Sequence, residues 1–233
     1  MKKILGLMIF MLVLQVNAQD NNELVKHYEA YYKQMKIQGD VQGIINALTH
    51  LNVLSPNVAR KDTLAAYYMN NNKHLQALNT IGIEMNANDS NLALEVKAVS
   101  LQNLNQAQRA IPPFEELFKR NSNVFVAYEL ADLKIQTNNL VDAKQYIDYG
   151  LANAKDDQKR SYFERQQPYQ VSVKAAFTYL KGILKYSEDQ KANIGAAIAL
   201  FDEALTLAPN FNLAQISRNA LESQKNPQPE TKN

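Results

Sequence analysis

Cysteine, histidine, serine and acidic residues are the side chains that could support catalysis or metal binding, and this chain of 233 residues has no cysteine. Thiolate nucleophiles, disulfides, Cys-ligated zinc and iron–sulfur clusters are therefore excluded. The three histidines, His27, His50 and His74, lie 23 and 24 residues apart and form no His-x-x-x-His pair. We expect each to face solvent or cap a helix, and we expect neither a metal nor a cofactor.

Other catalytic motifs are incomplete. Gly39 and Gly43 flank a turn, but no strand precedes them and no Gly-Lys-Ser/Thr follows, which excludes a phosphate-binding loop. No serine sits in a nucleophile-elbow pattern. Glu115 and Glu116 are adjacent in a predicted helix and point about 100° apart, so they cannot face each other across a glycosidic bond. We therefore expect a protein that is not an enzyme.

The start of the chain has the pattern of an export signal. Lys2 and Lys3 precede an apolar run at residues 4–16, which is shorter than the ~20 residues that span a bilayer as a helix. Val16-Asn17-Ala18 then offers small residues where a signal peptidase cleaves, so we expect a signal peptide at residues 1–18. An uncleaved anchor is the alternative. Gln19 stands where a lipoprotein would need cysteine, so we expect an exported protein, periplasmic or secreted.

Charge and composition describe the remaining chain. Without Lys2 and Lys3, the remaining sequence has 23 positive and 23 negative side chains and is formally neutral. A neutral protein without a basic run lacks the electrostatic footprint for nucleic acid or anionic lipid. No later apolar segment reaches spanning length, so we expect no membrane-embedded part after signal cleavage. Seven glycines and seven prolines are few turn-formers, which favours an all-helical fold.

Small and bulky apolar residues recur at an interval of 33 residues. The first set is Ile44, Ala77, Ala110 and Ala143. Four residues after each of these come Leu48, Ile81, Phe114 and Ile147. Twelve residues before each come Tyr32, Ala65, Ala98 and Ala131. Because small residues permit close helix approach, the interval indicates that one helix hairpin is stacked repeatedly, and a β-sheet in the body would contradict this interpretation.

Polar turns separate the predicted hairpins. They are Ser55-Pro56-Asn57, Asn88-Asp89-Ser90, Asn121-Ser122-Asn123 and Lys155-Asp156-Asp157. Their side-chain oxygens are typical N-caps for the helix that follows.

Residues 196–211, AAIALFDEALTLAPNF, place Ala197, Phe201 and Ala204 on one helical face, with Pro209 five residues later. This pattern resembles the second helix and closing proline of a tetratricopeptide repeat, and Pro56 closes the first unit in the same place. The resemblance covers roughly residues 22–223. It departs from the family in its 33-residue interval, its lack of tryptophan and the lysine that replaces the fourth closing proline.

The resemblance implies an all-α solenoid, a superhelix of about five hairpins over residues 19–223 with a C-terminal capping helix. The segment Leu213–Ser223 has the pattern of that cap, with Leu213, Ile216 and Leu221 on one side. Residues 224–233 contain no apolar side chain, and we expect a disordered tail there.

Two irregularities interrupt the array. Ala143 and Ala197 are 54 residues apart, and most of the excess lies in an insert near residues 156–170 that contains Tyr162, Phe163 and Tyr169. The insert either adds binding specificity or is an extra helix or spacer whose aromatics pack on the neighbouring repeat. The second irregularity is Pro112-Pro113, where we expect a kink or a restart of the helix.

The resemblance further implies that the first helix of each hairpin lines a groove for a protein or peptide partner. The expected partner-binding residues are Glu29, Lys33, Asp62, Glu95, Tyr128 and Asp132. Three of them, Glu29, Asp62 and Glu95, are carboxylates at one register position. They would favour a basic or amine-bearing partner, or they form a solvated charged face. Acidic residues here argue against the family's mode of gripping a C-terminal carboxylate.

The sequence thus predicts a non-enzymatic protein- or peptide-binding scaffold in the bacterial envelope. The alternative is a structural subunit of a periplasmic or outer-membrane assembly or secretion complex, because the fold by itself does not specify the function.

Overall fold

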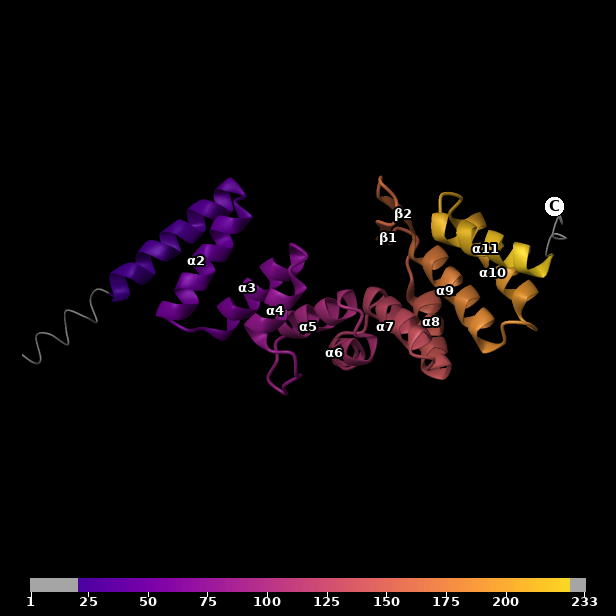
Figure 1. Cartoon of the computed structure of the whole chain (residues 1–233), viewed down its shortest axis with the longest axis horizontal. Helices are drawn as coiled ribbons and strands as arrows, with labels where there is room; N and C mark the ends of the chain where they lie inside the picture. Colours follow the sequence, from indigo (N-terminus) through magenta and orange to yellow (C-terminus); the bar gives the residue numbers. More distant parts are fainter. Residues whose placement is uncertain (1–20, 227–233) are drawn as a thin grey trace, which may run out of the picture. The chain divides into compact units, whose positions relative to one another are not determined.

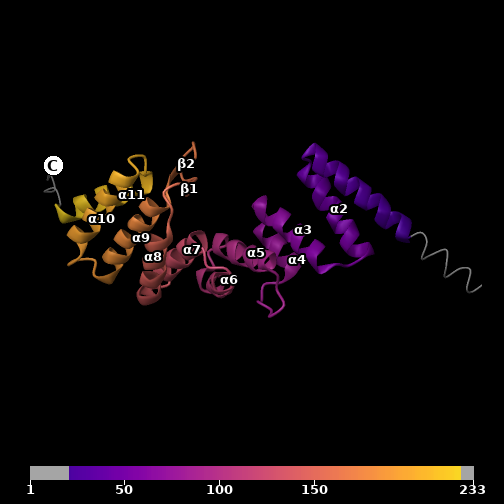
Figure 2. The ribbon, with the colours of Figure 1, turned by 180° about the vertical axis from the view of Figure 1, so that it is seen from behind.

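The computed structural model describes residues 21–226 and divides the chain into two compact units, residues 1–105 and residues 106–233 (Figures 1 and 2). The predicted signal peptide and residues 227–233 of the predicted tail lie outside the described residues. Within residues 21–226, no helix is long and apolar enough to cross a membrane.

The regular elements of unit 1 in its described part are all helices. A helix over residues 21–38 is followed by α2 (Val41–Leu54), α3 (Val58–Asn70), α4 (His74–Ile81) and α5 (Asn91–Asn103). The helix α3 packs on α2, α4 and α5, and its buried side chains belong to two apolar clusters, one with α2 through Leu64 and one with α4 and α5 through Ala65 and Met69.

Unit 2 continues the pattern and contains the insert. Its elements are α6 (Ala107–Arg120), α7 (Val124–Gln136), α8 (Leu140–Asn153), β1 (Lys159–Tyr162), β2 (Tyr169–Ser172), α9 (Val173–Glu188), α10 (Ile194–Leu207) and α11 (Asn212–Lys225). The pairs α7–α8 and α9–α10 are helix hairpins, and α8 packs on α9 to join them. The chain is therefore all-α in class, built from stacked helix hairpins as in an α-solenoid.

Most of the residues that recur every 33 positions are buried in the interior. Ala65, Ala77, Ala98, Ala110, Ala131, Ala143, Ala197 and Ala204 all have an exposed fraction of 0%, and Phe201 is also buried. The bulky partners Ile44, Leu48, Phe114 and Ile147 are buried, whereas Tyr32 and Ile81 are half-buried and Pro209 is exposed. Within each unit the recurring small residues thus lie in the core.

Two kinds of turn repeat with the same interval. Asn57, Ser90 and Asn123 are the N-caps of α3, α5 and α7, and each side chain accepts hydrogen bonds from backbone N–H groups of its helix. Inside the hairpins, Asn72, Asn105 and Asn138 have φ of 57°, 57° and 58°, and Gly39 has φ of 69°. These four residues are 33 apart, and asparagine and glycine are the residues that tolerate this left-handed backbone best.

The fourth predicted capping turn, Lys155-Asp156-Asp157, caps no helix. It leads instead into an antiparallel β-hairpin in which Arg160 pairs with Val171 and Tyr162 with Tyr169. The helix after the insert, α9, has Ser172 as its N-cap. The alternative of an extra helix is therefore wrong, and so is the expectation that a β-sheet would exclude the repeat fold, because the hairpin lies between two intact helix pairs.

A helix restart at Pro112 is also wrong, because α6 runs without interruption from Ala107 to Arg120, while the alternative of a kink stays a prediction. Pro112 and Pro113 have no N–H group to donate to the carbonyls one turn earlier, and the helix tolerates both prolines. Pro112 faces solvent, while the ring of Pro113 is buried.

The last helix matches the predicted cap only partly. Leu221 is buried and Leu213 is half-buried, but Ile216 is 55% exposed, and Ala214 takes the buried position in its place. The helix α11 also continues to Lys225, two residues beyond the expected boundary of the tail.

The stretch between α4 and α5 is irregular and is held by a buried cation. The helix α4 ends at Ile81, and Gly82 follows with φ of 87°. Lys97 of α5, with an exposed fraction of 0%, donates from Nζ to the Glu84 carbonyl at 2.7 Å and forms an ion pair with Asp89. This lysine ties the loop to the second turn of α5.

Candidate functional site

The six predicted partner-binding residues fall into three environments. Glu29, Lys33 and Glu95 are exposed, as a contact surface requires. Asp62 and Tyr128 are each 5% exposed, and Asp132 is half-buried. Glu29, Asp62, Glu95 and Tyr128 share one register position along the sequence, and Lys33 and Asp132 lie one turn later, but the exposure of these side chains differs from repeat to repeat.

In unit 1 the position is open. Glu29, Tyr32 and Lys33 line a cleft of about 460 Å³ between the helix at residues 21–38, α2 and α3. The other lining residues are Leu48, Leu51, Ala59, Arg60 and Thr63. We call this the Glu29 cleft.

Arg60 in this cleft serves the fold. Its Nη1 donates to the carbonyls of Leu51 and Ser55 at 3.0 and 2.6 Å, which satisfies the C-terminal end of α2. Besides Arg60, the ionisable groups of the lining are the carboxylate of Glu29, the ammonium group of Lys33 and the phenol of Tyr32. The cleft therefore combines both signs of charge over an apolar floor.

The predicted acidic wall does not form. The carboxylate of Asp62 accepts a hydrogen bond from Ser90 Oγ at 2.7 Å, and that same Ser90 oxygen caps α5. Asp62 thereby fixes the N-terminus of the next helix and is withdrawn from the surface. Lys33 beside Glu29 further offsets the negative charge.

In unit 2 the equivalent position is covered by the insert. The hydroxyls of Tyr128 on α7 and Tyr162 on β1 lie 2.8 Å apart in the interior. The Tyr128 ring also meets Phe177 of α9 edge to face, with centroids 5.5 Å apart. Figures 1 and 2 show the hairpin extending beside the end of α11, where the Tyr162 ring packs 5.0 Å from Phe211. Tyr128 is therefore a core residue beneath the hairpin.

Arg160 of β1 clasps the hairpin to α7. Its guanidinium carbon lies 3.8 Å from the centre of the Tyr128 ring, and its Nη1 donates to Glu129 Oε1 at 2.8 Å. Burial is the largest single effect and by itself would lower the pKa of Arg160, but the charge of Glu129, the two tyrosines and the hydrogen bond to Glu129 together outweigh it and raise the pKa. The arginine thus remains charged while it is largely enclosed. We call Arg160, Tyr128 and Glu129 the Arg160 clasp.

Asp132 lies one turn further along α7. Burial raises its pKa to about 6, and the nearby negative charge of Glu129 adds to the rise. A hydrogen bond from Gln136 Nε2 at 2.9 Å and the positive charge of Arg160 act in the opposite direction. The carboxyl group is therefore partly protonated near pH 6.

The three aromatic residues of the insert differ in role. Tyr162 is 8% exposed, and burial raises its pKa to about 12. Tyr169 is half-buried, stacks on Tyr162 with centroids 5.6 Å apart and donates its hydroxyl to Glu164. Two aromatics therefore pack on the neighbouring helices as one alternative predicted, whereas Phe163, at the strand end, is 73% exposed.

Arg160 and Glu129 were not among the residues singled out from the sequence. The insert presents its charged and aromatic residues in the run KRSYFERQQPYQ, and a strand that alternates sides places Arg160 and Tyr162 on one face. That alternation is the signal, but four residues of it are too short to separate a strand from a loop.

Potential metal ligands are dispersed in the described part of the chain. Between residues 21 and 226, no group of three or more histidine or acidic side chains is placed to hold a metal ion. The ring of His50 stacks on Tyr28 with centroids 4.3 Å apart, and His74 begins α4.

Comparison with solved structures finds proteins built from tetratricopeptide repeats. A tetratricopeptide repeat protein from Parabacteroides merdae ATCC 43184 matches with a TM-score of 0.66 at 16% identity, over 86% of this chain and 73% of its own. The MamA protein matches with a TM-score of 0.58 at 14% identity, over 89% of this chain and 98% of its own. No protein-family model and no curated protein matches the sequence. These similarities show that the fold is of the tetratricopeptide repeat type.

Proposed function

We propose that this protein is a non-enzymatic scaffold that binds a protein or peptide partner in the bacterial envelope. The observation that carries the proposal is the Glu29 cleft, which is open and lies on the first helices of two successive repeats. Its apolar floor and its exposed charges of both signs suit an amphipathic segment of a partner. The solved structures support the proposal through their fold.

The cleft favours unit 1 over unit 2 as the binding element. At the same register position, unit 2 has Tyr128, which is 5% exposed beneath the hairpin. A partner would have to displace the hairpin and break the Arg160 clasp to reach it. We infer that partner contacts are made through Glu29 and Lys33 in unit 1, with Glu95 as a further exposed acidic residue.

The envelope location is part of the proposal. It is supported by the basic start, the short apolar run and the small residues at Val16 and Ala18. Cell fractionation tests it, because an exported protein is recovered from the periplasm or the medium with a mass that lacks residues 1–18. Recovery in the cytoplasm at full mass contradicts the location and leaves the binding proposal to its own test.

Affinity capture from the envelope fraction tests binding. We expect partners bound by the wild type to be lost when Glu29→Lys and Lys33→Glu are combined, since both charges at the cleft are then reversed. The matched control is Glu203→Lys, because Glu203 is an exposed acidic residue on α10 of unit 2 and is not among the residues that line this cleft. Circular dichroism verifies that both variants remain helical.

Two outcomes separate the alternatives. Loss of the partner only in the Glu29/Lys33 variant supports recognition in the cleft. A captured assembly that is unchanged in this variant contradicts it and favours a structural subunit of an envelope complex, which would be held through other surfaces.

A further inference from the structure

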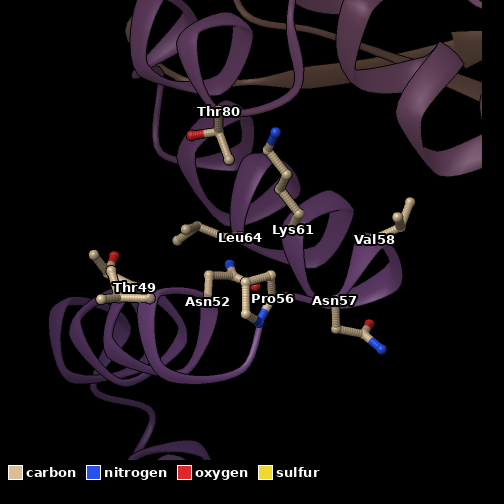
Figure 3. Close-up of a pocket in the computed structure, with 9 residues that line it drawn as sticks. Thr49, Asn52, Pro56, Asn57, Val58, Lys61, Leu64 and Thr80 are labelled. Atoms are coloured by element: carbon tan, nitrogen blue, oxygen red, sulfur yellow. The ribbon is translucent and has the colours of Figure 1, made fainter.

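Unpaired polar groups of this chain differ in whether a partner can reach them. In unit 1, a second cleft of about 500 Å³ lies where α2 ends and α3 begins, and Figure 3 shows Asn52 beside Pro56 in its wall. Both polar atoms of the Asn52 side chain are buried and lack a hydrogen-bond partner in the described part of the chain, so a molecule in the cleft cannot reach them. In unit 2, unpaired backbone groups lie instead along the outer edge of β1, where a partner can meet them.

The hydrogen bonds of the β-hairpin show which backbone groups of β1 point away from β2. The backbone N–H of Val173 donates to the carbonyl of Gln158 at 3.0 Å, so these two opposed residues are a hydrogen-bonded pair. Hydrogen-bonded and non-hydrogen-bonded pairs alternate along an antiparallel ladder. Lys159 and Ser161 therefore belong to non-hydrogen-bonded pairs of the hairpin, and their N–H and C=O groups point outward from β1.

The two outer edges of the hairpin differ in what covers them. On β2, the carbonyl of Gln170 accepts a hydrogen bond from Nδ2 of Asn210, in the turn before α11, at 3.1 Å. On β1, no hydrogen bond from the described part of the chain reaches the outward backbone groups of Lys159 and Ser161. Lys159 is exposed, and Phe163, which follows β1, is 73% exposed. A free edge of this kind is a template for a further strand.

The edge of β1 is complementary to itself in one antiparallel register. A two-fold axis at Ser161 places Lys159 of each copy opposite Phe163 of the other, where the lysine can cover the exposed ring. An axis one residue earlier would place Arg160 opposite Arg160, and an axis one residue later would place Lys159 opposite Arg165. Like charges directly opposite each other destabilise a sheet, so the register centred on Ser161 is favoured.

The charges that flank β1 agree with this register. Asp157 and Arg165 lie four residues before and four residues after Ser161, so each falls opposite the other residue of the second copy. Both are exposed, and neither forms an ion pair within the part of the chain that the structure describes. The same two-fold axis would therefore bring together two ion pairs, one on each side of the paired strands.

We propose that two copies of this chain form a two-fold symmetric dimer through β1, so that their hairpins join into one four-stranded antiparallel sheet. The N–H and C=O groups of Ser161 bond to those of Ser161 in the second copy, and Lys159 and Phe163 bond across the axis in the same way. The Arg160 clasp stays in place, because the Arg160 side chain faces the helices. The dimer goes beyond the scaffold function proposed above and gives one assembly two Glu29 clefts.

Disulfide trapping tests the register directly, because the chain has no cysteine of its own. Opposed residues of a hydrogen-bonded antiparallel pair have Cα atoms about 5.5 Å apart, which a disulfide can bridge. Mild oxidation of purified Ser161→Cys should therefore give a covalent dimer. The matched control is Gln170→Cys, which lies opposite Ser161 in the hairpin but on the outer edge of β2, and it should stay monomeric. Lys159→Cys combined with Phe163→Cys should also cross-link, whereas Lys159→Cys alone should not.

Sedimentation equilibrium measures the association of the chain without cysteine. Ser161→Pro should weaken the dimer by roughly tenfold or more, because proline has no N–H group for the second copy, yet an edge strand tolerates it. Gln170→Pro makes the same change on the other edge and should dimerise as the wild type does. Asp157→Arg should weaken the dimer by repulsion from Arg165, and combining it with Arg165→Asp should restore association. Hydrogen exchange of residues 159–172 verifies that the hairpin stays formed in each variant.

The proposal is overturned if the wild type stays monomeric at millimolar concentration, or if Ser161→Cys cross-links no faster than Gln170→Cys. A dimer that Ser161→Pro does not weaken also overturns it, because the two copies would then meet through another surface. The same holds if the Asp157→Arg/Arg165→Asp variant associates no better than Asp157→Arg. The Glu29→Lys/Lys33→Glu variant should dimerise as the wild type does, so the failure of one proposal is distinguished from the failure of the other.

Discussion

The Arg160 clasp should hold the hairpin to α7 with an energy that a double-mutant cycle can measure. Arg160 and Glu129 are in contact at 2.8 Å, and their side chains are 24% and 21% exposed. Exposed ion pairs contribute about 0.2–1 kcal/mol, while breaking a buried pair costs about 3–5 kcal/mol. A pair enclosed to this degree lies between the two, so we expect a coupling energy of about 1–2 kcal/mol.

The tyrosine adds to the cost of removing the arginine. The centre of the Tyr128 ring is 3.8 Å from the guanidinium carbon of Arg160, and a cation over an aromatic face contributes about 0.5–2 kcal/mol. Arg160→Gln should therefore destabilise the docked hairpin by about 2–4 kcal/mol, and Glu129→Gln by about 1–2 kcal/mol. Tyr128→Phe keeps the ring and removes only the hydroxyl contact to Tyr162, so it should cost about 0.5–1.5 kcal/mol.

Hydrogen exchange of the amides in residues 159–172 is the appropriate assay, because the hairpin can open while the helices stay folded. Since each 1.4 kcal/mol is a factor of ten, Arg160→Gln should speed exchange there by roughly 30- to 1,000-fold. Amides of α2 in unit 1 serve as the internal control. A coupling energy near zero, or hairpin exchange unchanged in Arg160→Gln, would refute the assignment of Arg160 as the clasp.

Three further predictions concern the pH response and the backbone. The pKa of Asp132 is about 6 in the folded state and 3.8 ordinarily, so the folded state binds the proton more tightly and the contribution of Asp132 to stability falls as pH rises from about 4 to 6. Asp132→Asn should therefore stabilise unit 2 by about 1–3 kcal/mol at pH 7.5 and by little at pH 4. Urea unfolding at the two pH values measures this difference. A Cβ at Gly150 would lie 2.1 Å from Phe177, so Gly150→Ala should lower stability by about 1–3 kcal/mol, whereas Gly195→Ala, with no atom within 4 Å, should be neutral or stabilising in thermal melts. Asn138→Ala should cost about 1 kcal/mol and Asn138→Gly nearly nothing, since φ is 58° there; equal melting of the two variants would contradict the backbone argument.

The sequence predicts the repeats because one packing problem recurs every 33 residues. Ala65, Ala98 and Ala131 must each fit beneath a neighbouring helix, and only small side chains do so. The caps Asn57, Ser90 and Asn123 follow the same interval. Such local and periodic requirements can be detected in a single chain, and this is why the fold class was predictable.

The candidate site was less predictable because accessibility depends on contacts distant in sequence. Asp62 shares a register position with Glu29, yet it is buried by a hydrogen bond to Ser90, which lies 28 residues further along the chain. Tyr128 is covered by Tyr162, 34 residues away. Ser90 recurs with the 33-residue interval as a helix cap, but the interval does not show that its hydroxyl also bonds to Asp62, and Tyr162 lies in the insert, outside the periodic pattern.

The insert itself was ambiguous for a physical reason. Strand propensity depends on the surface against which a segment packs, and two strands of four residues do not form a stable structure alone. Here Tyr162 and Val171 face the helices and are buried, while Lys159 and Gln170 face solvent. The helices α7, α9 and α11 therefore select the hairpin conformation, and the insert sequence does so only in their presence.

Those contacts also explain why the two units should differ in binding. In unit 2, Arg160 of the hairpin covers Tyr128 at the groove position, and Tyr162 of the hairpin packs on Phe211. A bound partner would make contacts of the same kind. An external ligand would have to exceed these contacts, which act without the entropy cost of association. Unit 1 has no insert at this position, and Glu29 and Lys33 stay exposed. Loss of the clasp in Arg160→Gln should thus leave partner binding by unit 1 unchanged, while a gain of binding in that variant would show that the hairpin competes for the same partner.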